Sequence, residues 1–229
     1  MTVPPPPWHA HEADDYDRQM TTSCSQLLEE IVADPARRQS ILRDPRKIHR
    51  ELFAPFVPAS YAIYAGNYRG LENSPLAHRI VAAASERRPG QTLKFCAPHE
   101  VHARTAELLQ HTRQHFDKAP ETDFGKLLAL THTFCWFGLI HPFLDGNGHI
   151  QRAMFATMAT EFGYPLSKRF AIHPRPYDRL LALGLETFTL AAAGQKSEEL
   201  GLVAEYLAFF LDGPFCAPRM NIGLASLYE

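Results

Sequence analysis

The sequence predicts a mainly α-helical protein that folds as a single domain and carries one short β-hairpin. Through most of the chain, apolar residues recur at the three- and four-residue spacing of a helix face. Only the stretch 88–98 combines a Pro-Gly turn with alternating residues, which is the pattern of an extended chain. With 229 residues, 45% of them apolar, the chain can bury one core of full size.

The N-terminal part of the chain is expected to be a tail followed by helices. Residues 1–15 are rich in proline and then acidic, so we expect a poorly ordered tail with polyproline II character. Residues 16–32 carry one apolar face that ends before Pro35, which predicts an amphipathic helix within an N-terminal helical region, 16–45. The next segments are predicted, in order, as a helix, a loop and a short helix: 46–56, 57–74 and 75–85.

The central segments predict two long helices on either side of a glycine-rich loop. Pro98 opens a helix that is apolar along one side as far as Phe116. Residues 123–140 are apolar on nearly every face after their first turn, which is typical of a buried central helix. The loop then leads into a helix with apolar residues at positions such as Ile150 and Met154. The last segments are predicted as two helices and a C-terminal tail: 177–193, 198–211 and 212–229.

Composition excludes several classes of function. The formal net charge is −2, from 23 basic and 25 acidic residues, so the chain has no electrostatic footprint for nucleic acid or an anionic membrane. The four cysteines lie far apart without C-x-x-C spacing, as expected for reduced thiols inside a cell. No apolar run reaches transmembrane length and no signal-peptide pattern opens the chain, so we expect a soluble, cytoplasmic protein.

The segment 141–152, HPFLDGNGHIQR, concentrates the chemistry of the chain. It contains a candidate base (His141), a carboxylate, a glycine-rich turn and a guanidinium. The glycines allow positive φ, so several backbone N–H groups can point at one anion, and the following helix adds the positive end of its dipole. Arg152 lies in the first turn of that helix, where its planar fork can close over a phosphate. The residues alone therefore indicate phosphate chemistry beside a base.

This segment resembles the signature of the Fic family, H-P-F-x-[D/E]-G-N-G-R-x-x-R, with His149 standing where the family usually has arginine. Upstream, IHRELF (48–53) and YAGNYRG (64–70) resemble the family's helix and its W-A-G-x-Y-R turn. Downstream, EFGYPL (161–166) resembles the end of the helix after the signature. The resemblance covers roughly residues 46–211 and implies a Fic-like helical bundle with a β-hairpin flap.

The resemblance implies a protein adenylyltransferase, which moves AMP from Mg–ATP to a Ser, Thr or Tyr hydroxyl of a protein target. His141 matches the family's general base, and an ordinary imidazole pKa of about 6.5 suits a base near neutral pH. Asp145 matches the Mg²⁺ ligand, and one carboxylate suffices where phosphates and water complete the shell. The implied nucleotide-binding residues are Gly146, Asn147, Gly148, His149 and Arg152.

Each of these residues also has a plainer structural interpretation. In isolation, His141 is a satisfied histidine at a helix end, Asp145 is a turn former and Arg152 is a solvated surface arginine. The glycine-rich triplet can be a tight turn and nothing more. The order of these residues and the match to the signature favour the functional interpretation.

The extended stretch after the Pro-Gly turn is expected to be the flap of the family. This flap is a hairpin that aligns the modified segment of the target by pairing with it as an added strand. Its residues are Thr92, Leu93, Lys94 and Phe95. An ordinary hairpin in a helical domain is the alternative. The sequence does not identify the protein target that such a flap would hold.

An inhibitory helix is a further expectation from the resemblance. Ser25 and Glu29 match the [S/T]-x-x-x-E pattern, whose glutamate pairs with the arginine that corresponds to Arg152 and blocks productive nucleotide binding. Glu30 stands where the family has Gly or Asn. A chance match on a surface helix is the alternative.

Two other functions stay open on the sequence. One is a nucleotide-binding pseudoenzyme, because His149 replaces an arginine that would be charged at any working pH. The other is an enzyme of the same fold that uses a different phosphate-containing donor, transferring UMP or phosphocholine. A secreted effector is the alternative to the cytoplasmic location.

Overall fold

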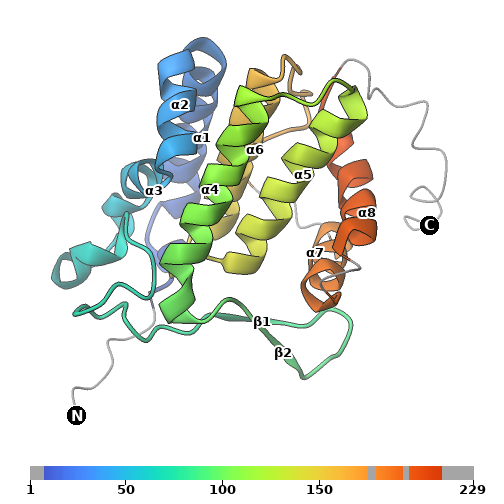
Figure 1. The fold of residues 1–229 in the computed structure, drawn as a ribbon. Helices are drawn as coiled ribbons and strands as arrows, with labels where there is room; N and C mark the ends of the chain where they lie inside the picture. Colours follow the sequence, from blue (N-terminus) through green and yellow to red (C-terminus); the bar gives the residue numbers. More distant parts are fainter. Residues whose placement is uncertain (1–7, 175–178, 193–195, 213–229) are drawn as a thin grey trace.

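The computed structural model describes residues 8–174, 179–192 and 196–212, and these are mainly helical (Figure 1). The helices are α1 (Tyr16–Ala33), α2 (Pro35–Arg43), α3 (Arg46–Phe53), α4 (Val101–Asp117), α5 (Asp123–Ile140), α6 (Asn147–Glu161), α7 (Arg179–Leu190) and α8 (Lys196–Ala208). The strands are β1 (Ala82–Ala84) and β2 (Thr92–Lys94), and 3₁₀ helices lie at Ala10–Glu12, Ala54–Phe56, Ala59–Tyr64 and Pro98–Glu100. The predicted fold class is confirmed. Across the described ranges, every helix is too short or too polar to cross a membrane.

The core forms around α5 and α6, the two helices that flank the glycine-rich loop. Helix α5 packs against α4, α6, α7 and α8, and α6 also packs against α1 and α2. Side chains such as Leu130 and Phe137 on α5, and Met154 and Phe155 on α6, are fully buried. Because α5 is covered on several sides, nearly all of its faces can be apolar. The loop is therefore held between two rigid helices.

Residues 8–15 correct the expectation of a loose tail over 1–15. Trp8 is 6% exposed, and its ring packs edge-on against Phe53 with centroids 5.9 Å apart. Its Nε1 donates a hydrogen bond to the carbonyl of Phe56 at 3.2 Å. An indole is stable in a buried place only when its N–H finds an acceptor, and this pocket supplies one.

Helix α2 lies within the helical region expected over 16–45, and one other element differs from the sequence-based expectation. Pro35 begins α2, because its missing N–H is harmless in a first turn, and Asp34 caps that helix by accepting from the N–H of Ala36 at 2.8 Å. The short helix predicted over 75–85 is wrong, because Ala82–Ala84 forms strand β1. The helix preference of alanine is a weak bias, and pairing with β2 overrides it.

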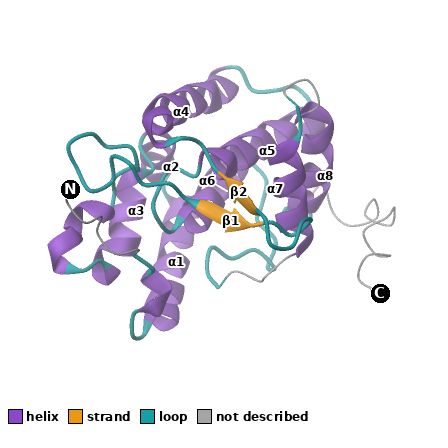
Figure 2. Cartoon of the chain, turned by 90° about the horizontal axis from the view of Figure 1, so that it is seen from below, coloured by secondary structure: helices purple, strands orange, loops and turns teal. Residues whose placement is uncertain are grey.

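The hairpin of β1 and β2 lies at the end of the bundle where α5 ends and α6 begins (Figures 1 and 2). Its strands are antiparallel, with Ala83 opposite Leu93. The buried carboxylate of Glu186 on α7 accepts from the hydroxyl of Ser85 and, at 2.8 Å, from the N–H of Glu86. These bonds hold the turn of the hairpin against the bundle.

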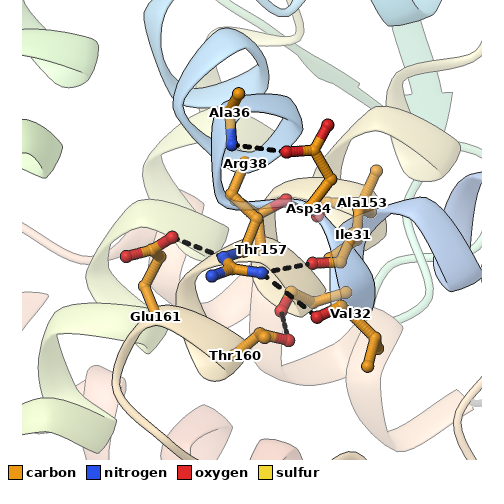
Figure 3. A network of polar contacts seen from close by, with 10 residues as sticks. Ile31, Val32, Asp34, Ala36, Arg38, Ala153, Thr157, Thr160 and Glu161 are labelled. Carbon is orange, nitrogen blue, oxygen red and sulfur yellow. Dashed lines mark hydrogen bonds and ion pairs between the residues drawn. The ribbon is translucent and has the colours of Figure 1, made fainter.

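Arg38 on α2 joins α1 to α6 (Figure 3). Its Nη1 donates to the carbonyls of Ile31 and Val32 at the end of α1, at 2.9 and 3.2 Å, and its Nε donates to the carboxylate of Glu161. Carbonyls in the last turn of a helix lack partners within the helix, so a guanidinium is a suitable cap. The contact fixes α1 against α6.

We expect Arg38→Met to lower the free energy of unfolding by about 2 kcal/mol, because it removes an ion pair and the donor to two carbonyls. The arginine side chain is 13% exposed, so water can replace these bonds only in part. Urea unfolding of this variant and of Arg43→Met, an exposed arginine on the same helix, measures the difference. Equal losses in the two variants would contradict this role of Arg38.

Candidate active site

A cavity of about 760 Å³ opens between α1, α6 and the loop that joins α5 to α6. Its walls bring together the residues predicted for catalysis, metal binding and nucleotide binding. The lining residues are Tyr16, Asp17, Thr21, Val81, His141, Leu144, Asp145, Gly146, Asn147, Gly148, His149, Arg152, His173 and Pro174. Helix α1 and the loop before α7 thus contribute walls that the sequence did not predict.

His141 ends α5 with a left-handed φ of 52°. Its Nδ1 lies 3.3 Å from the carbonyl oxygen of Gly138, which can only accept, so Nδ1 carries the proton and Nε2 is the basic nitrogen. The ring stacks on Phe95 with centroids 3.9 Å apart. Burial lowers the pKa of His141 to about 3. The positive charge of Arg69 also lowers this pKa, whereas the hydrogen bond to Gly138 raises it. The ring is therefore neutral at any physiological pH, which corrects the expectation of an ordinary imidazole pKa near 6.5.

Arg69 holds the end of α5, and it is a site residue that the sequence did not predict. Its side chain is 0% exposed and donates to four carbonyl oxygens. Two belong to the end of α5, Ile140 at 2.8 Å and His141 at 2.6 Å, and two bracket the hairpin, Arg79 at 3.3 Å and Cys96 at 2.8 Å. The negative end of the helix dipole helps to satisfy this buried cation. Arg69 thereby connects the histidine to both ends of the hairpin.

His49 on α3 supports the loop and is a second site residue that the sequence did not predict. Its buried ring stacks between Phe53 and Phe143, with centroids 4.7 and 3.9 Å away. Nδ1 accepts from the N–H of Gly66 at 2.9 Å, so Nε2 carries the proton and donates to the carbonyl of Asp145 at 3.0 Å. The ring makes both bonds only when neutral. Burial lowers the pKa of His49 to about 3, although the bond to Asp145 acts in the opposite direction.

We expect the protein to lose stability as the pH falls below about 6.5, the ordinary pKa of histidine. The unfolded chain takes up a proton at His49 in this range, whereas the folded protein takes it up only near pH 3, so acid favours unfolding. Between about pH 6.5 and pH 5, this one residue should remove about 2 kcal/mol from the free energy of unfolding.

Urea unfolding at about pH 7 and pH 5 tests this expectation by comparing wild type with His49→Gln. A glutamine amide offers a donor and an acceptor but does not titrate, so the variant should lose less stability in acid. The same pH dependence in both proteins would mean that His49 does not cause the effect.

The glycine-rich turn presents two backbone N–H groups at the start of α6. Gly146 has a φ of 78°, and a Cβ there would lie 2.3 Å from Cζ of Phe53, so only glycine fits. The side chain of Asn147 accepts from the N–H of Phe143 at 2.8 Å and donates to its carbonyl at 2.9 Å, so it braces the loop. Within the described chain, the N–H groups of Asn147 and Gly148 have no acceptor. This helix start is therefore suited to an anion.

The carboxylate of Asp145 is oriented by backbone N–H groups on both of its oxygens. Gly146 donates to Oδ1 at 2.6 Å, and Ala10 donates to Oδ2 at 2.8 Å. Each oxygen can accept one more bond, and Asp145 lines the cavity, so the residue fits a magnesium site that phosphates and water complete. Among the described residues, no three His, Cys, Asp or Glu side chains form a metal site by themselves. A cation at Asp145 would therefore depend on the nucleotide.

Arg152 and His149 both reach from α6 to the loop before α7. Nε of Arg152 donates to the carbonyl of Ile172 at 2.8 Å, and Nε2 of His149 lies 3.0 Å from Nδ1 of His173. The guanidinium of Arg152 lies over the helix start, since a Cβ on Gly148 would be 3.2 Å from its Nη1. A tethered cation thus adjoins the N–H groups of the turn, which suits a phosphate.

One of the residues predicted as a flap, Phe95, lies next to His141. Phe95 stacks on its ring, and Val81, which precedes β1, lines the cavity. The other predicted flap residues form β2: Thr92, Leu93 and Lys94. The strand is mostly exposed, so its edge can pair with an extended segment of another protein.

Ser25 and Glu29 lie on α1, but neither lines the cavity. Both are exposed, and Glu29 follows the part of α1 that faces the cavity by two turns. The structure therefore does not bring the predicted inhibitory residues to the site of Arg152. The acidic residue that α1 presents to the cavity is Asp17, which the sequence did not predict.

Comparisons with solved structures support the fold. A Fic domain containing signaling protein from Bacteroides thetaiotaomicron has a TM-score of 0.61 at 20% identity, over 86% of this chain and 69% of that one. The N-terminal Fic domain of a Bartonella effector protein from Bartonella sp. AR 15-3, a substrate of the VirB T4SS, has a TM-score of 0.61 at 13% identity, over 93% of this chain and 86% of that one. A comparison with curated protein sequences found no match.

The family model described as Fic/DOC family matches residues 41–159, slightly more than half of the chain. This range contains α3, α4, α5, most of α6 and the loop that carries the candidate base. It therefore covers the loop and the helix start that carry His141, Asp145 and Arg152, whereas the cavity walls from α1 and from the loop before α7 lie outside the matched range. The chain belongs to the Fic/DOC family.

Proposed function

We propose that this protein transfers AMP from ATP to a Ser, Thr or Tyr hydroxyl of a protein target. Fic proteins generally transfer a nucleotide or another phosphate-containing group to proteins, and membership of the family assigns that broad activity to this chain. The observation that supports the finer proposal is a single cavity that holds a neutral imidazole, His141, and an anion-binding helix start beside Arg152.

His141 acts as the general base in this proposal. Its Nε2 takes the proton of the target hydroxyl while the hydroxyl oxygen attacks the α-phosphorus in line. The bond from the hydroxyl oxygen to the α-phosphorus forms, and the bond from the α-phosphorus to the departing pyrophosphate breaks. The N–H groups of Asn147 and Gly148, together with Arg152, stabilise the charge on the phosphoryl oxygens and on pyrophosphate.

Asp145 would hold the Mg²⁺ that accompanies ATP. Such an ion neutralises phosphate charge when it is bound. The bonds from Ala10 and Gly146 orient the carboxylate, and the bond from His49 to the carbonyl holds the backbone. These contacts fix Asp145 before nucleotide arrives, which is what a preorganised site requires.

The protein target is proposed to dock along β2 as an added strand. Backbone pairing supplies affinity in this mode with little demand on the target's side chains. Phe95 follows β2 directly and stacks on His141, so a segment paired with β2 lies close to the base. We propose no nucleic acid or membrane partner, and we place the reaction in the cytoplasm.

Incubation with Mg²⁺, a cell lysate and ATP labelled at the α-phosphorus tests the proposed function. Label that depends on the added protein should appear from α-labelled ATP and not from γ-labelled ATP, and His141→Ala should lower this labelling by about two to four orders of magnitude. Parallel reactions with α-labelled UTP and with a labelled phosphocholine donor would reveal another transferred group. Binding of ATP without label from any donor would indicate a pseudoenzyme and refute the proposal.

A further inference from the structure

Two side chains on the same face of α6 form hydrogen bonds to two successive residues of the loop before α7. Arg152 binds the carbonyl of Ile172 at 2.8 Å, and His149 binds the ring of His173, with Nε2 and Nδ1 3.0 Å apart. The two imidazole planes are inclined by only 21°, with centroids 5.2 Å apart. The loop therefore delivers a second imidazole to the cavity wall, beside His149, which stands where the family usually has arginine.

His173 also has a carboxylate partner, Asp17 of α1. Its Nε2 lies 3.3 Å from Oδ1 of that residue. Tyr16 places its ring edge against both imidazoles, and Phe53 packs against His149. The two histidines are thus a polar pair held between aromatic walls, with a carboxylate at one end and the cavity beside them.

The contact between the rings limits the charge that the pair can carry. Only one proton fits between two ring nitrogens 3.0 Å apart, so His149 and His173 cannot both be imidazolium ions in this arrangement. The pair is therefore neutral or carries a single positive charge. An arginine at position 149 would instead carry its charge at any working pH.

We propose that His149 and His173 form one phosphate-binding unit, which takes up a single proton when it binds the phosphates of the nucleotide and whose positive charge Asp17 stabilises. This inference rests on the proposed function, because it assumes that nucleotide phosphates enter this cavity. A positive pair can donate to phosphate oxygens in a charge-assisted bond, whereas a neutral pair attracts them much less. The affinity of the pair for phosphate then depends on the uptake of one proton.

The neighbouring charges agree with a pair that is neutral until phosphate arrives. Burial lowers the pKa of His173, Asp17 raises it, and Arg152 lowers it. A bound phosphate adds negative charge beside the pair, and so it favours the protonated form. Among the described residues, the titratable and charged groups that line the same cavity as the pair are Tyr16, Asp17, His141, Asp145 and Arg152.

Calorimetric titration with ADP in the absence of metal tests the proposal. The titration is done at about pH 8, where the phosphates of ADP are fully ionised. It is repeated in two buffers with different enthalpies of ionisation, because the difference in binding heat between the buffers gives the number of protons taken up. Wild type should take up close to one proton for each ADP bound. Its affinity should fall by up to about tenfold for each further pH unit, as one-proton linkage requires.

Three variants separate this proposal from a merely structural role of the pair. His149→Arg should bind ADP more tightly, with no proton uptake and no pH dependence from this source. Asp17→Asn should reduce the uptake without unfolding the protein, because the Asp17 side chain is 92% exposed. His78→Ala, which removes an exposed histidine outside the cavity, should leave affinity and uptake unchanged.

The remaining outcomes refute either the phosphate-binding pair or the proposed function. ADP binding without proton uptake by wild type, or equal uptake by wild type and His149→Arg, would overturn the phosphate-binding pair. If ADP binds as described but no group is ever transferred, the proposed function fails and the pair stands. If wild type binds no ADP at all, the phosphate-binding pair is refuted, and the labelling experiment with Mg²⁺ and ATP decides the proposed function by itself.

Discussion

Replacing His141 by alanine should slow AMP transfer by about two to four orders of magnitude, the usual loss for a missing general base. The basic Nε2 acts on the attacking hydroxyl in the transition state and contributes little to holding the nucleotide in the ground state. Nucleotide affinity should therefore stay close to that of wild type. The rate of labelling and calorimetric binding of ADP measure the two effects separately.

A second substitution keeps this test free of backbone strain. Position 141 has a φ of 52°, which alanine adopts at a cost of about 1 kcal/mol and asparagine adopts more readily. His141→Asn should therefore fold as wild type does and still lack the base. If His141→Asn retained most of the activity, His141 would be structural. Because the pKa of His141 is about 3, the rate at saturating ATP should also stay level between about pH 6 and pH 8.

Arg69→Met should be strongly destabilising, by about 3 to 5 kcal/mol, because four carbonyl oxygens lose their donor at once. The lost bonds join the end of α5 to both ends of the hairpin. We therefore expect His141 and β2 to lose their fixed relation even in molecules that stay folded. Urea unfolding gives the stability, and amide hydrogen exchange at Phe95 and Cys96 reports the anchoring of the hairpin.

Two comparisons make the Arg69 prediction specific. Arg69→Lys keeps the charge but has a single nitrogen to donate, so it should recover only part of the lost stability. Arg88→Met, at an exposed arginine in the turn of the hairpin, should change stability by less than about 0.5 kcal/mol. Similar losses in Arg69→Met and Arg88→Met would refute the role of Arg69.

Secondary structure was predictable where a single element carried its own signal. Helix α5 has the predicted bounds, Asp123–Ile140, because its apolar faces and its N-terminal turn are local features. Strand β1 was not predictable, because Ala82–Ala84 favours a helix by itself and becomes a strand only through its pairing with β2. The packing of Trp8 depends likewise on Phe53 and Phe56, which are distant in sequence.

The residues of the candidate site also fall into those that the sequence predicts and those that it does not. The residues from His141 to Arg152 were predictable together, because one short loop and the start of one helix carry their spacing and chemistry. The side chains of His49, Arg69 and His173 were not, although the first two lie in segments that resemble the family. Each acts through a hydrogen bond to a residue more than 20 positions away, and residue spacing holds no information about such a contact.

The sequence by itself determined the helical fold class and the buried helix before the loop, and it predicted a phosphate-binding turn beside a base. These properties arise from local backbone preference and from the order of apolar and polar residues, which neighbouring positions express directly. Only the tertiary structure decided that His141 is neutral, that Asp145 is held by the N-terminal segment, and that His149 faces a second histidine. Burial and long-range hydrogen bonds control the charge of a side chain, and both exist only after distant segments have packed together.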